Sequence, residues 1–189
     1  MFSLRIHPNR WIVAGLAVLM AVTRFHHEGT AFAFPDASLA VFFLLGWYLG
    51  GAALFVGFLL VALAIDSLAV GYGGVGAFCV SPAYGFLVPA YAAIWWAGRC
   101  TERHALTLPG SALALLASTT AAYLISEISF FVLSGRTTGL DWRAYGSGML
   151  EHYPVYLGST LAYVGLVLAL LDPWVRQRLT VTSRPATTR

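Results

Sequence analysis

ASLAVFFLLGWYLGGAALFVGFLLVALAIDSLAV, residues 37–70, is the stretch that decides the fold class of this chain. It carries one charged residue, Asp66, and is much longer than the roughly 20 residues that cross a bilayer as a helix. It lacks the polar/apolar alternation of barrel strands, which favours helices. The stretch therefore predicts two membrane spans, at about 38–49 and 52–70, separated by the Gly50–Gly51 pair.

The composition of the whole chain supports the same class. Of the 189 residues, 59% are hydrophobic and 10% are charged, and the mean hydropathy is +0.75. Too few polar groups are present to cover a soluble domain, whereas helices satisfy their own backbone hydrogen bonds in lipid. Four further apolar runs, at about 10–25, 83–98, 110–133 and 150–171, complete a single all-α transmembrane domain over residues 1–189 with six predicted spans.

The arginines predict the orientation, since the chain contains no lysine. With the N-terminus in the cytoplasm, eight arginines lie inside and three outside, as the positive-inside rule expects. The inside set is Arg5, Arg10, Arg99, Arg103, Arg176, Arg178, Arg184 and Arg189, and the outside set is Arg24, Arg136 and Arg143. We therefore expect a multi-pass inner-membrane protein with both termini cytoplasmic and no nucleic-acid partner. A signal peptide over residues 1–33 is the competing interpretation.

This topology gathers the chemically distinctive residues on the external side. The three longer external loops, 24–37, 70–82 and 135–150, lie on the same side as the ionisable and aromatic side chains that need an explanation: His26, His27, Glu28, Asp36, Cys79, Arg136, Asp141, Trp142, Arg143, Glu151 and His152. An outward-facing binding site over a helical bundle is the simplest account of this distribution.

Cys79 lies in GAFCVSPAYGF, residues 76–86, and has two interpretations. It is either a small buried apolar residue or a thiolate ligand to a soft or borderline metal, with His26 and His27 on the same side. The cysteine and histidine spacings match no zinc site. A metal held in its own macrocycle, however, needs only one or two protein ligands, and one cysteine suits that.

The same residues carry a resemblance to a known family. Six helices with a short second one, and an external glycine-rich loop with a single cysteine before Pro-Ala-Tyr-Gly, resemble the BtuM family of bacterial cobalamin transporters. That family is related to the substrate-binding S-components of energy-coupling factor (ECF) transporters. The resemblance covers Cys79 and His27 specifically, and it implies an S-component-like bundle that takes up cobalamin from the periplasm. It also implies Cys79 as an axial ligand of the corrin cobalt, with the nucleotide base detached.

Several further residues are candidates for corrin contacts. A corrin site should be wide and mostly apolar with scattered hydrogen-bond donors. The candidates are Phe34, Phe78, Tyr84, Trp142, Tyr145 and Tyr153, whose alternative role is the interfacial aromatic belt. His27 is a candidate second axial ligand or hydrogen-bond donor, and His26 could exchange roles with it. A solvated interfacial histidine is the alternative for both.

Three ionisable residues fall near or within the predicted spans, where charge is costly. Arg24 is expected to be a snorkelling anchor, and Asp66 an interfacial carboxylate. Glu127 lies deeper in its span. For Glu127 we favour a structural, hydrogen-bonded carboxyl over a gating or proton-coupled role.

Transport also needs an energy source. Ala17-x-x-x-Ala21 on the first span forms a face of small residues, and a similar motif docks the coupling subunit in S-components. This segment is therefore a candidate contact for an ECF-type module, although intramolecular packing explains it equally well. The chain has no Walker A sequence and so does not hydrolyse ATP itself.

Two other functions stay open. One is an S-component-like transporter for a different vitamin or a metal. The other is a membrane thiol enzyme in which Cys79 works with His26, His27 or His152, which no GxSxG or HExxH signature supports. We predict no catalytic residue: the one reaction expected is displacement of cyanide from bound cobalamin by thiolate, which is a ligand exchange.

Overall fold

The computed structural model describes residues 10–25, 34–72, 81–135 and 137–171. These residues form six α-helices and one 3-10 helix, and no strand occurs among them. The elements are α1 (Arg10–Phe25), α2 (Ser38–Tyr48), α3 (Ala52–Tyr72), η2 (Pro82–Phe86), α4 (Leu87–Arg103), α5 (Leu108–Leu133) and α6 (Trp142–Leu171). The prediction of an all-helical chain is confirmed for this part.

Three of the helices are long and apolar enough to cross a membrane: α3 over Ala52–Gly71, α5 and α6. Large apolar side chains also cover the outer faces of the bundle. Trp11, Trp96 and Leu113 are each at least 65% exposed, a pattern that lipid explains and water does not. The chain thus has the character of a membrane protein, whereas the crossing of all six helices stays a prediction.

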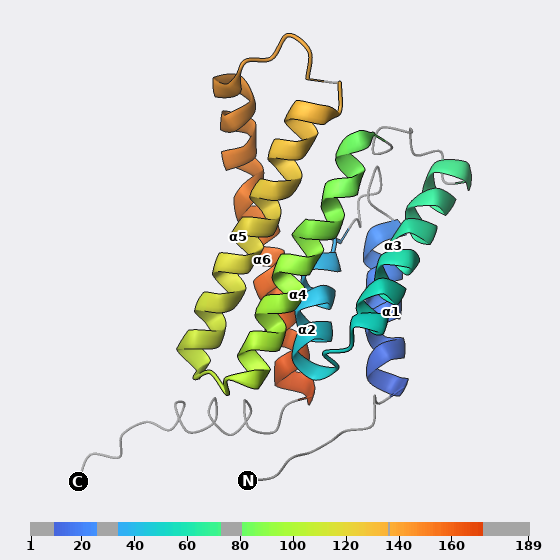
Figure 1. Ribbon diagram of the computed structural model, residues 1–189, viewed down its shortest axis with the longest axis vertical. Helices are drawn as coiled ribbons and strands as arrows, with labels where there is room; N and C mark the ends of the chain where they lie inside the picture. The colour runs from blue at the N-terminus through green and yellow to red at the C-terminus, as the bar shows by residue number, and fades with distance from the viewer. Residues whose placement is uncertain (1–9, 26–33, 73–80, 136, 172–189) are drawn as a thin grey trace, which may run out of the picture.

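The helices run up and down, so that the bundle has two distinct ends (Figure 1). At one end, which we call the short-turn end, α1 begins, α6 ends, and short connections join α2 to α3 and α4 to α5. At the other, the long-loop end, α1, α3 and α5 end and η2 and α6 begin. The segments that the sequence assigns to the external side all start or finish at the long-loop end.

The short helix α2 is the centre of the bundle. Every residue from Ser38 to Gly46 is buried, and the side chains of Phe42 and Phe43 have no exposed surface. A helix that is apolar on all faces is stable only when other helices surround it, and α1, α3, α4, α5 and α6 all contact α2. Its 11 residues give a length of about 16 Å. It fills only the part of the bundle toward the short-turn end (Figure 1).

Glycines bring α2 and α4 into backbone contact. A Cβ atom added at Gly46 would collide with the carbonyl oxygen of Trp95, and one added at Gly98 would collide with that of Phe43. The turn after α2 needs a glycine for a different reason. Gly50 has φ +61°, and its N–H donates to the Leu45 carbonyl at 2.8 Å, the usual way in which a helix ends on a left-handed residue.

Two boundaries differ from the sequence prediction. The predicted span at 83–98 begins with the 3-10 turn η2, and the α-helical part extends to Arg103. The expected loop at 135–150 is wrong over its second half, because α6 begins at Trp142. The Asp141 carboxylate accepts a hydrogen bond from the Ala144 N–H at 2.7 Å, which satisfies a free donor of the first turn.

Gly98→Ala should destabilise the bundle by about 1–3 kcal/mol, because the new methyl group forces α4 away from the backbone of α2. Gly57→Ala is the matched control, since a Cβ there meets no atom within 4 Å. Thermal unfolding of the two variants in detergent measures the difference. Equal midpoints for both variants would contradict the close packing of α2 and α4.

Candidate functional site

A cavity of about 340 Å³ opens above the start of α2, toward the long-loop end. It exists because α2 begins only at Ser38, so that the neighbouring helices extend past it and enclose space. Its wall is mainly apolar and carries five tyrosines, three carboxylates and one arginine. These are Tyr84, Tyr91, Tyr123, Tyr145, Tyr156, Asp36, Asp66, Glu127 and Arg24. Volumes of this size are typical of small-molecule sites with a few polar groups.

Arg24, in the last turn of α1, forms one side of the cavity. Its side chain is 8% exposed and makes a two-point ion pair with Asp66 of α3, with Nε–Oδ1 and Nη2–Oδ2 distances of 2.6 Å. Nη1 also donates to Ser38 Oγ at 2.9 Å, to Tyr91 Oη at 2.8 Å and to Asp36 Oδ2 at 3.3 Å. Planar two-point pairing is the strongest geometry for arginine and carboxylate. The expectation of a snorkelling anchor is therefore wrong.

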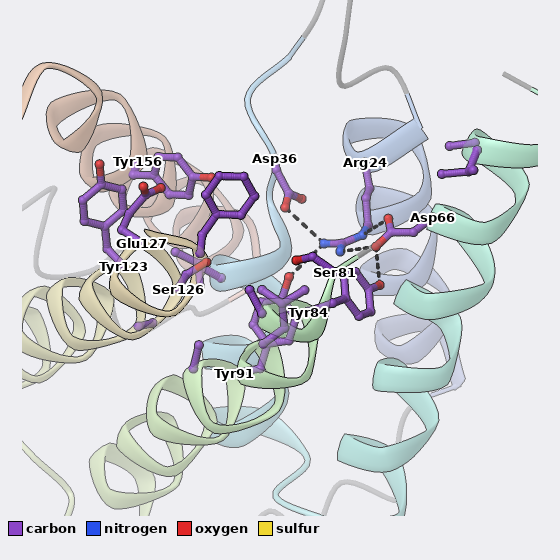
Figure 2. Close-up of a pocket in the computed structure, with 18 of the residues that line it drawn as sticks. Arg24, Asp36, Asp66, Ser81, Tyr84, Tyr91, Tyr123, Ser126, Glu127 and Tyr156 are labelled. Carbon is purple, nitrogen blue, oxygen red and sulfur yellow. Dashed lines mark hydrogen bonds and ion pairs between the residues drawn. The ribbon is translucent and has the colours of Figure 1, made fainter. Parts of the chain in front are cut away.

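The two carboxylates around Arg24 tie further elements to the same point. Asp66 accepts a hydrogen bond from the hydroxyl of Tyr84 in η2, so it is not the interfacial carboxylate that the sequence indicates. Asp36 Oδ1 accepts from the backbone N–H and the hydroxyl of Ser38, at 2.9 and 2.7 Å, and so holds the first turn of α2. This cluster, which we call the Arg24 network, joins α1, α2, α3, η2 and α4 (Figure 2).

Glu127 of α5 stands on the opposite wall, among tyrosines (Figure 2). Its Oε2 accepts a hydrogen bond from Tyr145 Oη at 2.7 Å. Tyr123 and Tyr156 flank it with ring centroids 5.0 Å apart, and the Tyr123 hydroxyl donates to the carbonyl of Met149 at 2.7 Å. Glu127 is hydrogen bonded, as expected, but its partner is a tyrosine of α6, and it also lines the cavity.

The structure brings two of the predicted contact residues together in the cavity wall, Tyr84 and Tyr145. Three others lie outside the wall. Phe34 is 63% exposed, Trp142 packs on Phe131 with ring centroids 3.9 Å apart, and the Tyr153 hydroxyl bonds to Thr120 Oγ1 at 2.7 Å. His26, His27, Phe78 and Cys79 lie outside the described residues.

The sequence interpretation missed several wall residues, namely Arg24, Asp66, Tyr91, Tyr123 and Tyr156. Charges of opposite sign near the same end of two predicted spans were the signal for the Arg24–Asp66 pair, because intramembrane ionisable groups usually have a partner. The tyrosines had no comparable signal. Nothing in the linear pattern separates a tyrosine facing a cavity from one facing the membrane interface.

The described residues contain no group of three or more histidine, cysteine, aspartate or glutamate side chains placed to hold a metal ion. Cys100, near the short-turn end of α4, is a free thiol. Ala17 and Ala21 of α1 are partly buried and pack against the hydrophobic core. Intramolecular packing therefore accounts for part of that small-residue face.

A scan against protein-family models and a search of curated proteins each find no match to this chain.

Arg24→Met should destabilise the protein by about 2–4 kcal/mol, because it leaves two carboxylates with only 19% and 22% side-chain exposure facing each other without a cation. Arg103→Met, at an exposed position of α4, is the matched control and should change stability by less than about 0.5 kcal/mol. Unfolding in detergent measures both variants. A loss for Arg24→Met no larger than that of the control would show that the network does not hold the helices together.

Proposed function

We propose that this chain is a bacterial inner-membrane transporter protein that captures cobalamin from the periplasmic side, with all six helices in the membrane and both termini in the cytoplasm. The observation that carries the proposal is the cavity at the long-loop end. Ser81 and Tyr84 build part of its wall, and they follow Cys79 by two and five positions in the sequence. Two residues of chain span at most about 7 Å, so a thiolate at position 79 is within reach of the cavity mouth.

A thiolate suits the cobalt of a corrin. The macrocycle supplies four equatorial nitrogens, so a protein needs to offer only axial ligands, and sulfur is a soft, strong donor. Binding to the metal would deprotonate the thiol. With cyanocobalamin the cobalt–carbon bond to cyanide would break as the cobalt–sulfur bond forms, and cyanide would leave with the thiol proton. The metal would keep its oxidation state, so this step is ligand exchange.

The size of the cavity constrains how a corrinoid would bind. A volume of about 340 Å³ lies at the lower end of the range for drug-sized ligands, and a complete corrinoid is larger. We therefore propose that the macrocycle lies across the mouth of the cavity, on the side of Ser81 and Tyr84. Peripheral side chains of the corrin would then enter the space between the Arg24 network and Glu127.

The charge distribution supports the proposed orientation. The eight-to-three division of arginines assigns the short-turn end to the cytoplasm, so the cavity would open to the periplasm. The helix α2 does not need to span the bilayer by itself, since it is enclosed by other helices. Docking of an ECF-type energising module would use the outward part of α1 around Ala17 and Ala21.

A second function is favoured by the same volume. A transporter for a smaller vitamin would fit its whole ligand into 340 Å³, and Cys79 would then have a packing role. Of the residues named for a thiol enzyme, only His152 is described, and it is exposed with its Nδ1 2.7 Å from the carbonyl oxygen of Gly148.

Purified protein incubated with cobalamin should co-elute with it and show a shifted corrin absorption band. Cys79→Ser should abolish the shift and weaken binding by more than about tenfold, since even loss of an outer partner of a metal ligand has that effect. Cys100→Ser is the matched control and should behave like the wild type, because Cys100 lies in the last turn of α4 and is not part of the cavity wall.

Two results would contradict the proposal. Absence of co-elution would remove cobalamin as the ligand. Co-elution with an unshifted band that is the same in Cys79→Ser would leave cobalamin as the ligand. It would exclude the Cys79 thiolate as a ligand of the cobalt. Growth of a cobalamin-dependent bacterial strain that relies on this chain for uptake separates transport from binding.

A further inference from the structure

The cavity wall has one described cation, Arg24, and most of its N–H groups already have acceptors among the described residues. The guanidinium of Arg24 donates through all three nitrogens, to two carboxylates, a serine and a tyrosine. Guanidinium groups recognise phosphates and carboxylates only through free N–H groups. The charge of Arg24 is already paired with Asp36 and Asp66, so Arg24 stabilises the wall and is a weak site for a further anionic group.

Glu127 differs from the other two carboxylates of the wall. Asp36 and Asp66 both pair with Arg24, whereas Glu127 makes no ion pair within the described chain. Tyr145 donates to its Oε2 at 2.7 Å, and no described donor bonds to its Oε1. The hydroxyl oxygen of Ser81, also in the wall, is buried without a hydrogen-bond partner among the described residues. The cavity thus presents unused acceptor capacity on both sides.

The formal charges of the wall point the same way. With three carboxylates and one guanidinium, the described lining has a formal charge of −2. An additional anion would lie close to like charges in an apolar surrounding, where repulsion is stronger than in water. A neutral N–H donor has no such penalty and gains a charge-assisted hydrogen bond.

We propose that Glu127, oriented by Tyr145, is an acceptor subsite that admits primary amide groups of the ligand into the cavity and excludes carboxylates and phosphates. The inference rests on the proposed function and deepens it. Cobalamin carries primary amides around the corrin and a phosphodiester on its nucleotide arm. The amides would enter the cavity, and the phosphodiester would stay outside it.

The test compares two probes, cobalamin and the cobalamin monocarboxylates in which one peripheral amide is hydrolysed. Wild-type protein should bind at least one monocarboxylate about tenfold or more weakly than cobalamin. Glu127→Gln should reduce the ratio of the affinity for cobalamin to the affinity for the monocarboxylate by about tenfold. The amide of glutamine accepts a weaker hydrogen bond from the cobalamin amide than a carboxylate does. It also does not repel the carboxylate of the probe. Glu151→Gln, the same change at an exposed position of α6, should leave the ratio as in the wild type.

Tyr145→Phe provides a second variant that keeps the carboxylate and removes the hydroxyl that orients it. It should lower the same affinity ratio by several-fold. Thermal unfolding of Tyr145→Phe and Glu127→Gln checks that both variants are folded. The inference is overturned if Glu127→Gln has the same affinity ratio as the wild type. It is also overturned if the wild type binds all probes with equal affinity. In both cases the proposed function stands. Wild-type protein that binds none of the probes overturns both.

Discussion

The buried guanidinium of Arg24 is the interaction on which the arrangement at the long-loop end depends. A charge with 8% exposure is stable only when carboxylates and hydrogen bonds compensate for its lost hydration. Asp66 and Asp36 supply that compensation from α3 and from the segment before α2, and Tyr91 adds a bond from α4. The elements on this side of the cavity, α1, α2, α3, η2 and α4, are thereby held in one register.

The second constraint is the length of α2. A helix of 11 residues that is buried from Ser38 to Gly46 cannot extend through the whole bundle, so the neighbouring helices enclose space beyond its first turn. The glycine contacts with α4 keep α2 at the short-turn end, and the Arg24 network fixes its start. A cavity with an aromatic and acidic wall is the consequence, and Ser81 in that wall follows Cys79 by two positions in the sequence.

Much of the fold was predictable because lipid imposes a simple rule on sequence: long apolar runs become helices. The start of α6 was not predictable in this way, since residues 142–148 have the composition of a polar loop. Asp141, a typical residue before a helix, was the available signal. The wall of the cavity was less predictable still. Arg24 and Asp66 are 42 positions apart, and Tyr145 approaches Glu127 only because α6 starts early. Pairings of this kind depend on packing between helices, which local pattern does not encode.

Cobalt X-ray absorption of the purified complex with cobalamin tests the central claim most directly, because it identifies the atoms bound to the metal. With Cys79 as an axial ligand, the cobalt has one sulfur neighbour, which is lost in Cys79→Ser and retained in Cys100→Ser. A cobalt surrounded only by nitrogen, oxygen and carbon in the wild-type complex would contradict this prediction.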